Sequence, residues 1–181
     1  MDHLSEECGV VGVFGNDDAA RMCYLGLYSL QHRGQESAGI VSFDNSNMYI
    51  VKDMGLVQDV FNTDKISYLK GSSAVGHVRY STTGSPNINN IQPLYSKTSK
   101  GKIAIAHNGN LTNAYNLYKD MLSDGALFQS SVDSEVILHM LSRTKSDSIV
   151  DVMQKTLQKI EGSYSLVILG KGYLIGARDP K

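Results

Sequence analysis

Apolar, β-branched segments bounded by turn residues alternate with amphipathic segments along the chain. Residues 8–14 (CGVVGVF) precede Gly-Asn-Asp-Asp, which predicts a buried strand, a turn and a helix cap. The same pattern predicts strands at 38–43, 48–52, 73–80, 102–107, 163–169 and 173–177. Apolar residues at helical spacing predict helices at 19–32, 115–122, 134–141 and 148–160. We therefore expect an α+β domain with two mainly antiparallel sheets and helices outside them.

The hydrophobic fraction and the balance of charges favour a single globular domain and argue against a nucleic-acid-binding or membrane protein. The 181 residues are 41% hydrophobic, which suits one globular domain. With 17 Lys and Arg against 18 Asp and Glu, no net positive field would attract nucleic acid or an anionic membrane. No apolar run reaches the length of a membrane span, and the acidic N-terminus lacks the apolar core of a secretion signal. We expect a cytoplasmic protein with no nucleic-acid or membrane partner.

Cysteine and histidine are too sparse for a disulfide framework or a zinc site. The chain has two cysteines and five scattered histidines, so we expect no metal in it. Cys23 lies inside a predicted helix and suits core packing. Cys8 can be a small core residue at the start of a strand, or a nucleophile. If residues 1–7 were removed, the Cys8 α-amine, with a pKa of about 7.7–8.0, could act as the base for its own thiol.

Three further positions each have an ordinary and a functional interpretation. Asn108 and Gly109 fit an Asn-Gly turn, or an oxyanion hole built from a side-chain amide and a backbone N–H. Arg79 could be an exposed residue at a strand end, or a clamp for a carboxylate. Asp133 could cap the helix that follows, or face a substrate ammonium. Taken together with Cys8, they describe a site for a zwitterionic amino acid with a side-chain amide.

Six motifs occur in the order and spacing of one known family. They are ECGVVGVFG, LQHRGQESAGIV, GHVRYSTTG, AHNGNL, VDSE and GARDP. Over essentially its whole length the chain resembles the N-terminal glutaminase domain of amidophosphoribosyltransferases. HRGQESAGI and RYSTTG separate it from other class II glutamine amidotransferases, namely glucosamine-6-phosphate synthase, asparagine synthetase and glutamate synthase. The resemblance implies an Ntn-hydrolase fold, a four-layer αββα sandwich of two antiparallel sheets.

The resemblance also implies roles for individual residues around the nucleophile. Cys8 would become the nucleophile once residues 1–7, a leader peptide, are removed. Asn108 and Gly109 would form the oxyanion hole. Arg33 and Gly34 would lie beside the nucleophile and help to place the substrate amide.

Four more residues complete the implied site. Arg79 and Asp133 would bind the backbone groups of glutamine, and Thr82 would add a contact from the polar segment 81–92. Tyr80 matches a tyrosine that couples the site to an ammonia channel. The resemblance gives His77 and His107 no catalytic role, and we expect both to be structural.

The implied reaction involves a larger protein. Residues 8–181 would hydrolyse glutamine to glutamate and ammonia, and a phosphoribosyltransferase domain absent from this chain would combine that ammonia with phosphoribosylpyrophosphate. The product, 5-phosphoribosylamine, begins de novo purine synthesis. Mg²⁺ and the nucleotide sites belong to the absent domain, some relatives hold an iron–sulfur cluster, and the full protein is expected to be a homo-oligomer.

Two alternatives to this function stay open at the level of sequence. One is a glutaminase domain that supplies ammonia to another acceptor, such as a sugar phosphate. The other is a silent binding or assembly module, which would bind glutamine without hydrolysing it even with Cys8 at the N-terminus.

Overall fold

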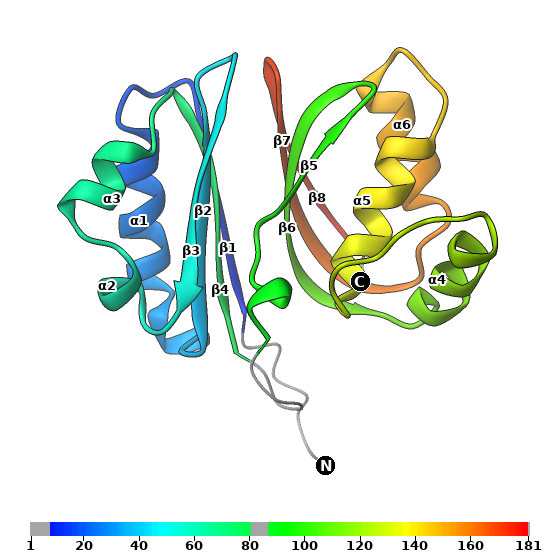
Figure 1. The fold of residues 1–181 in the computed structure, drawn as a ribbon, viewed down its shortest axis with the longest axis horizontal. Coiled ribbons are helices and arrows are strands. Elements are labelled where there is room, and N and C mark those ends of the chain that lie inside the picture. The colour runs from blue at the N-terminus through cyan, green and yellow to red at the C-terminus, as the bar shows by residue number, and fades with distance from the viewer. Residues whose placement is uncertain (1–7, 81–86, 181) are drawn as a thin grey trace.

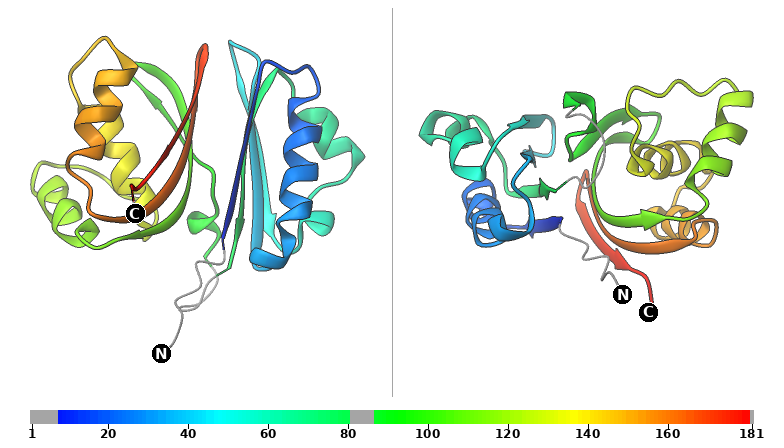
Figure 2. Two further views of the ribbon diagram at one scale, coloured as in Figure 1. Left: turned by 180° about the vertical axis from the view of Figure 1, so that it is seen from behind. Right: turned by 90° about the horizontal axis from the view of Figure 1, so that it is seen from below.

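Two four-stranded antiparallel sheets pack face to face, and helices cover the outer face of each (Figure 1). The computed structural model describes residues 8–80 and 87–180. Residues 1–7 and Thr82, both part of the expectations above, lie outside the described residues. The expected α+β class and the αββα layering are confirmed, as the view from behind also shows (Figure 2).

The first sheet has the strand order β1-β4-β2-β3. Its strands are β1 (Gly9–Phe14), β4 (Ser73–Arg79), β2 (Ser37–Phe43) and β3 (Met48–Met54). Its outer face is covered by α1 (Ala19–Ser29), α2 (Val57–Val60) and α3 (Thr63–Tyr68). Helix α1 buries Cys23 and Leu27 against this sheet, so Cys23 is a core residue, as expected.

The second sheet has the strand order β5-β6-β7-β8. Its strands are β5 (Leu94–Thr98), β6 (Gly101–Leu111), β7 (Gly162–Gly170) and β8 (Tyr173–Arg178). The helices on its outer face are α4 (Ala114–Ser123), α5 (Asp133–Arg143) and α6 (Ile149–Leu157). Helix α5 is the most buried of the three and packs against β6 through Ile137 and Leu141.

Small and branched apolar side chains fill the space between the sheets. The central cluster consists of Val41, Phe43, Val75, Ala104, Ala106 and Leu169. Two of the strands that contribute to it, β4 and β6, are interior strands of their sheets. The sandwich therefore fixes the end of β4 and the second half of β6 close to each other, which is where the motif residues lie.

The expected elements are present, with differences at their ends. The helix expected at 19–32 stops at Ser29, and a 3-10 turn, η1 (Gln31–Arg33), follows it. A second short turn, η2 (Ile88–Asn90), lies in the polar segment. Three short elements were not expected: α2, α3 and the edge strand β5. Among the described residues, no helix is both long enough and apolar enough to cross a bilayer.

Candidate active site

A cavity of about 260 Å³ opens where the ends of β1 and β4 meet β6 and the start of α5. Predicted site residues make up half of its lining: Cys8, Arg79, Tyr80, Gly109 and Asp133. The other lining residues are His77, Gln92, His107, Asn110 and Val132. The structure thus brings together residues that are up to 125 positions apart in the sequence, from Cys8 to Asp133.

Cys8 directly precedes β1 and is held by side chains from both halves of the sandwich. Its carbonyl oxygen accepts hydrogen bonds from Arg33 Nε and Asn108 Nδ2, each at 3.1 Å. Its thiol lies 3.8 Å from the Tyr80 carbonyl oxygen. Burial raises the pKa of the Cys8 thiol, and the nearby Arg79 only partly offsets this effect. The thiol is therefore protonated at neutral pH and needs a base before it can attack.

Asn108 and Gly109 lie within strand β6, so the alternative of an Asn-Gly turn is wrong. They pair with Ser165 and Tyr164 of β7. Gly109 has a φ of +145°, and a Cβ built on it would lie 2.2 Å from the Ser163 carbonyl oxygen. Only glycine suits this backbone position. The strand therefore holds the Asn108 amide beside Cys8, the predicted nucleophile.

Arg79 ends β4 and points into a largely buried environment. Its side chain is 18% exposed, so the alternative of an exposed strand cap is wrong. Nε lies 3.9 Å from a Glu36 carboxylate oxygen, and Nη1 lies 3.5 Å from the Asn90 carbonyl oxygen. Because a guanidinium has five N–H donors in a fixed plane, Arg79 can also bind a ligand carboxylate.

Asp133 is the first residue of α5, and its carboxylate is bound by strand β6 as well as by the Ser134 backbone N–H of its own helix. Oδ2 accepts a hydrogen bond from the Leu111 backbone N–H at 3.0 Å, and Oδ1 lies 3.2 Å from His107 Nδ1. Burial acts to raise the pKa of Asp133, but His107 and the Leu111 N–H outweigh it and hold that pKa below its usual range. Asp133 therefore presents a negative charge to the cavity.

Gly34 allows the segment after η1 to lie directly on the end of β4. A Cβ at this position would lie 2.7 Å from the Val78 carbonyl carbon and 2.8 Å from the Arg79 backbone nitrogen. This close approach places Arg33 within reach of Cys8. Tyr80 is 44% exposed and follows Arg79 at the mouth of the cavity.

Two buried amides that sequence reasoning did not single out tie the polar segment to the site. The Gln92 side chain accepts from the His107 backbone N–H at 2.7 Å and donates to the His107 carbonyl at 3.1 Å. Asn90 donates to Ser131 Oγ at 2.9 Å and accepts from the Ser131 N–H at 3.0 Å. Their only signal in the sequence is an amide-rich stretch, which is equally typical of an exposed loop.

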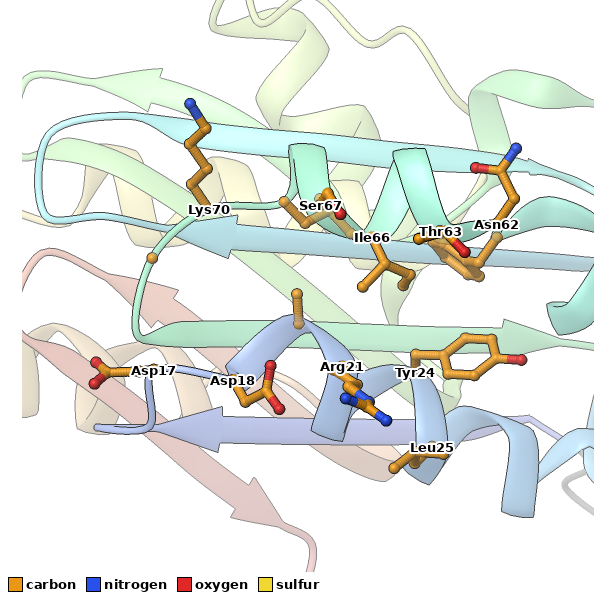
Figure 3. Close-up of a pocket in the computed structure, with 14 residues that line it drawn as sticks. Asp17, Asp18, Arg21, Tyr24, Leu25, Asn62, Thr63, Ile66, Ser67 and Lys70 are labelled. Carbon is orange, nitrogen blue, oxygen red and sulfur yellow. The ribbon is translucent and has the colours of Figure 1, made fainter.

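A larger hollow, of about 860 Å³, lies on the outer face of the first half, between α1 and α3 (Figure 3). Its lining includes Asp18, Arg21, Asn62 and Lys70, but none of the predicted site residues. The smaller cavity is the candidate site because it is lined by Cys8, the predicted nucleophile, and by Arg79 and Asp133. Within the described part of the chain, no three His, Cys, Asp or Glu side chains cluster closely enough to bind a metal ion.

Comparison with known proteins decides the family. The family model described as "Glutamine amidotransferase domain" matches residues 77–181, more than half of the chain. An amidophosphoribosyltransferase from Lacticaseibacillus casei is 46% identical over 178 residues, which cover 98% of this chain and 92% of that sequence. The chain belongs to the amidophosphoribosyltransferase family. It corresponds to the glutamine amidotransferase domain of that family, as the motifs predict.

Other members of the amidophosphoribosyltransferase family are longer. The one from Rhizobium etli is 47% identical over 180 residues, which are 99% of this chain and 36% of that protein. The solved structure of glutamine phosphoribosylpyrophosphate amidotransferase from Bacillus subtilis, complexed with ADP and GMP, superposes with a TM-score of 0.88 at 40% identity. That match covers 94% of this chain and 37% of the other. The chain thus spans little more than a third of the length of these two relatives.

Proposed function

We propose that this chain hydrolyses glutamine to glutamate and ammonia, as the glutaminase part of a longer amidophosphoribosyltransferase. The main support is the cavity in which Cys8, Arg79 and Asp133 converge from three elements. Arg79 binds the α-carboxylate of glutamine, and Asp133 binds its α-ammonium. The side-chain amide then extends toward the Cys8 thiol, where the Asn108 amide and the Gly109 N–H stabilise the oxyanion.

The Cys8 α-amino group is the base that this site favours. Of the two cavity histidines, His77 has its Nε2 3.1 Å from the His107 carbonyl, and burial lowers its pKa to about 3, so it is a poor proton acceptor. His107 directs Nδ1 at Asp133, away from the thiol. In the 181-residue sequence the Cys8 nitrogen is part of a peptide bond. Removal of residues 1–7 would release it as an amine with a pKa of about 7.7–8.0.

The reaction then proceeds in two balanced steps. The thiol proton passes to the α-amine while Sγ attacks the amide carbon, and the amine returns the proton to the leaving nitrogen. The C–N bond breaks, ammonia leaves, and a thioester remains on Cys8. Water, activated by the same amine, adds to the thioester, and glutamate departs as the thiol regains its proton.

The remaining part of the parent protein would use the ammonia. By analogy with its family, the ammonia attacks C1 of phosphoribosylpyrophosphate and displaces pyrophosphate to give 5-phosphoribosylamine. Exposed Tyr80, beside the nucleophile at the cavity mouth, lies where ammonia would pass to a second domain.

Two measurements test the proposal. Intact mass shows whether the purified chain has lost residues 1–7; if it has not, a variant that begins at Cys8 is used. Ammonia release from glutamine is then compared between wild type, Cys8→Ala and Cys23→Ala. We expect Cys8→Ala to abolish hydrolysis and Cys23→Ala to retain it, because Cys23 is fully buried between α1 and its sheet. Hydrolysis that survives Cys8→Ala would refute the mechanism.

A further inference from the structure

We infer that His107 is a positioning residue that fixes the Asp133 carboxylate for recognition of the substrate's α-ammonium group. The inference rests on the proposed function, because it assigns Asp133 to a glutamine ammonium. It replaces the expectation that His107 is only structural.

The carboxylate is held at both oxygens by one strand. His107 Nδ1 lies 3.2 Å from Asp133 Oδ1, and the Leu111 N–H donates to Oδ2 at 3.0 Å. Both donors belong to β6, which is rigidly paired with β7 over this stretch. Neither donor comes from the helix that carries Asp133. The two bonds therefore fix the rotation of the carboxylate relative to the sheet, and through the sheet relative to Cys8.

His107 itself is buried, and both its backbone and its ring Nδ1 have polar contacts. Its ring is 2% exposed, and Nδ1 also lies 3.2 Å from Ser134 Oγ. Gln92 binds both its backbone N–H and its carbonyl, and His77 Nε2 lies 3.1 Å from the same carbonyl. The backbone of His107 is thus fixed by three buried hydrogen bonds, and its enclosed ring meets Ser134 and Asp133 at Nδ1, so the contact with Asp133 is pre-organised.

The partners of the ring nitrogens decide where the proton lies. Nδ1 faces a carboxylate, which accepts, whereas Nε2 is buried without a hydrogen-bond partner among the described residues. A proton on Nδ1 satisfies Asp133. A proton on Nε2 alone would instead be a buried, unpaired donor, which is costly. The imidazole thus donates from Nδ1 to the carboxylate and fixes its orientation.

A matched pair of substitutions separates the hydrogen bond from the volume of the ring. Asn and Leu have nearly the same shape, but only Asn keeps a donor close to the position of Nδ1. Each is introduced at His107 in protein that begins at residue 8. For binding measurements this protein also carries Cys8→Ala, so that the ligand is not hydrolysed. Calorimetry then compares binding of L-glutamine with binding of glutaramate, the analogue that lacks the α-amino group. His139→Leu is the control, because His139 lies on the same helix as Asp133 but contacts the Leu127 carbonyl and the Phe128 ring and does not line the cavity.

We expect His107→Leu to weaken L-glutamine binding about 10- to 100-fold while glutaramate binding changes little. His107→Asn should recover most of the loss, and His139→Leu should behave as wild type. In turnover assays of the Cys8-containing proteins, KM should rise more than kcat falls. An unchanged preference for L-glutamine in His107→Leu, with glutaminase activity intact in the wild type, would overturn the inference alone. If the wild type neither bound nor hydrolysed L-glutamine, the proposed function would fail as well.

A spectroscopic readout needs no variant that could misfold. Two-bond ¹H–¹⁵N correlation spectra of histidine-labelled wild-type protein distinguish the Nδ1–H from the Nε2–H tautomer. We expect the Nδ1–H pattern for His107. The Nε2–H pattern would contradict the assignment, because the ring could then not donate to Asp133.

Discussion

Replacement of Gly109 by alanine probes whether β6 and β7 are as tightly apposed at the oxyanion site as the structure shows. The new Cβ would lie 2.2 Å from the Ser163 carbonyl oxygen and 2.8 Å from the Tyr164 Cα. The first of these distances is more than 1 Å inside the ordinary contact distance of about 3.5 Å. The obstruction is backbone, so no side-chain rotation relieves it. Either β6 and β7 must separate, or the backbone at residue 109 must move away from its φ of +145°.

Gly101, at the other end of the same strand, is the matched control. Its φ is +108°, but a Cβ there meets nothing within 4 Å. Gly101→Ala therefore incurs only backbone strain, about 1–3 kcal/mol. Gly109→Ala incurs the same kind of strain and in addition a steric overlap, for which overpacking in cores suggests roughly 1–3 kcal/mol more.

Urea unfolding monitored by circular dichroism measures the difference. We expect Gly109→Ala to lose roughly 1–3 kcal/mol more in free energy of unfolding than Gly101→Ala, with similar m-values. Ammonia release from the Cys8-terminal proteins should fall in Gly109→Ala, because its neighbour Asn108 moves with the strand, and should persist in Gly101→Ala. Equal loss of stability in the two variants would refute the close apposition of the strands at this site.

Three further predictions concern single groups of the site. Asn108→Ala should lower kcat for glutamine hydrolysis about 10²- to 10³-fold with a smaller change in KM, and an unchanged kcat would remove Asn108 from the oxyanion hole. A second experiment measures the rate at which iodoacetamide alkylates Cys8 as a function of pH, in Cys23→Ala protein that retains residues 1–7. Because burial raises the pKa of the Cys8 thiol, the midpoint of this rate should lie above the usual thiol pKa of about 8.5. A midpoint below that value would contradict the described environment of Cys8. The pKa of Asp133 is lower in the folded state than in the unfolded state. The ionised carboxylate therefore stabilises the fold at pH values above the unfolded pKa of about 3.9, and this contribution is lost as the pH falls through the folded pKa. Thermal unfolding should therefore show wild type losing stability relative to Asp133→Asn below about pH 4, and a constant difference would count against the ionised carboxylate.

The sequence predicts most of the fold because its long elements have strong periodicity. Strand 8–14 and helix 134–141 are clear from pattern alone. Helix α2 has four residues, too few to show a helical period, and its two valines are buried only through contacts with the rest of the first half. The edge strand β5 alternates, but it lies in a polar stretch that is equally compatible with a loop.

The site residues were predictable by type, but their supporting contacts were not. Asn90 binds Ser131, 41 residues away, and Gln92 binds the backbone of His107, 15 residues away. Neither pairing leaves a periodic signal in the sequence. The position of β6 could not be read from the sequence, although this strand carries Asn108 and Gly109 and supplies His107 and Leu111 as partners of Asp133.

The alternation of side chains along β6 places neighbouring residues of one strand beside Cys8 and beside Asp133. Ala104 and Ala106 face the first sheet, whereas Ile103 and Ile105 face α5. Continued by two residues, the same alternation sends Asn108 toward Cys8 and His107 toward Asp133. Neighbouring residues of the AHNGN segment thus lie on opposite sides of the strand, and in the proposed function one would act at the amide end of the substrate and the other at its ammonium end. A shift of one residue in the register would exchange these faces and separate both side chains from their partners. The long pairing of β6 with β7, from Ala104 to Leu111, opposes such a shift, and so the proposed mechanism depends on the register of this strand.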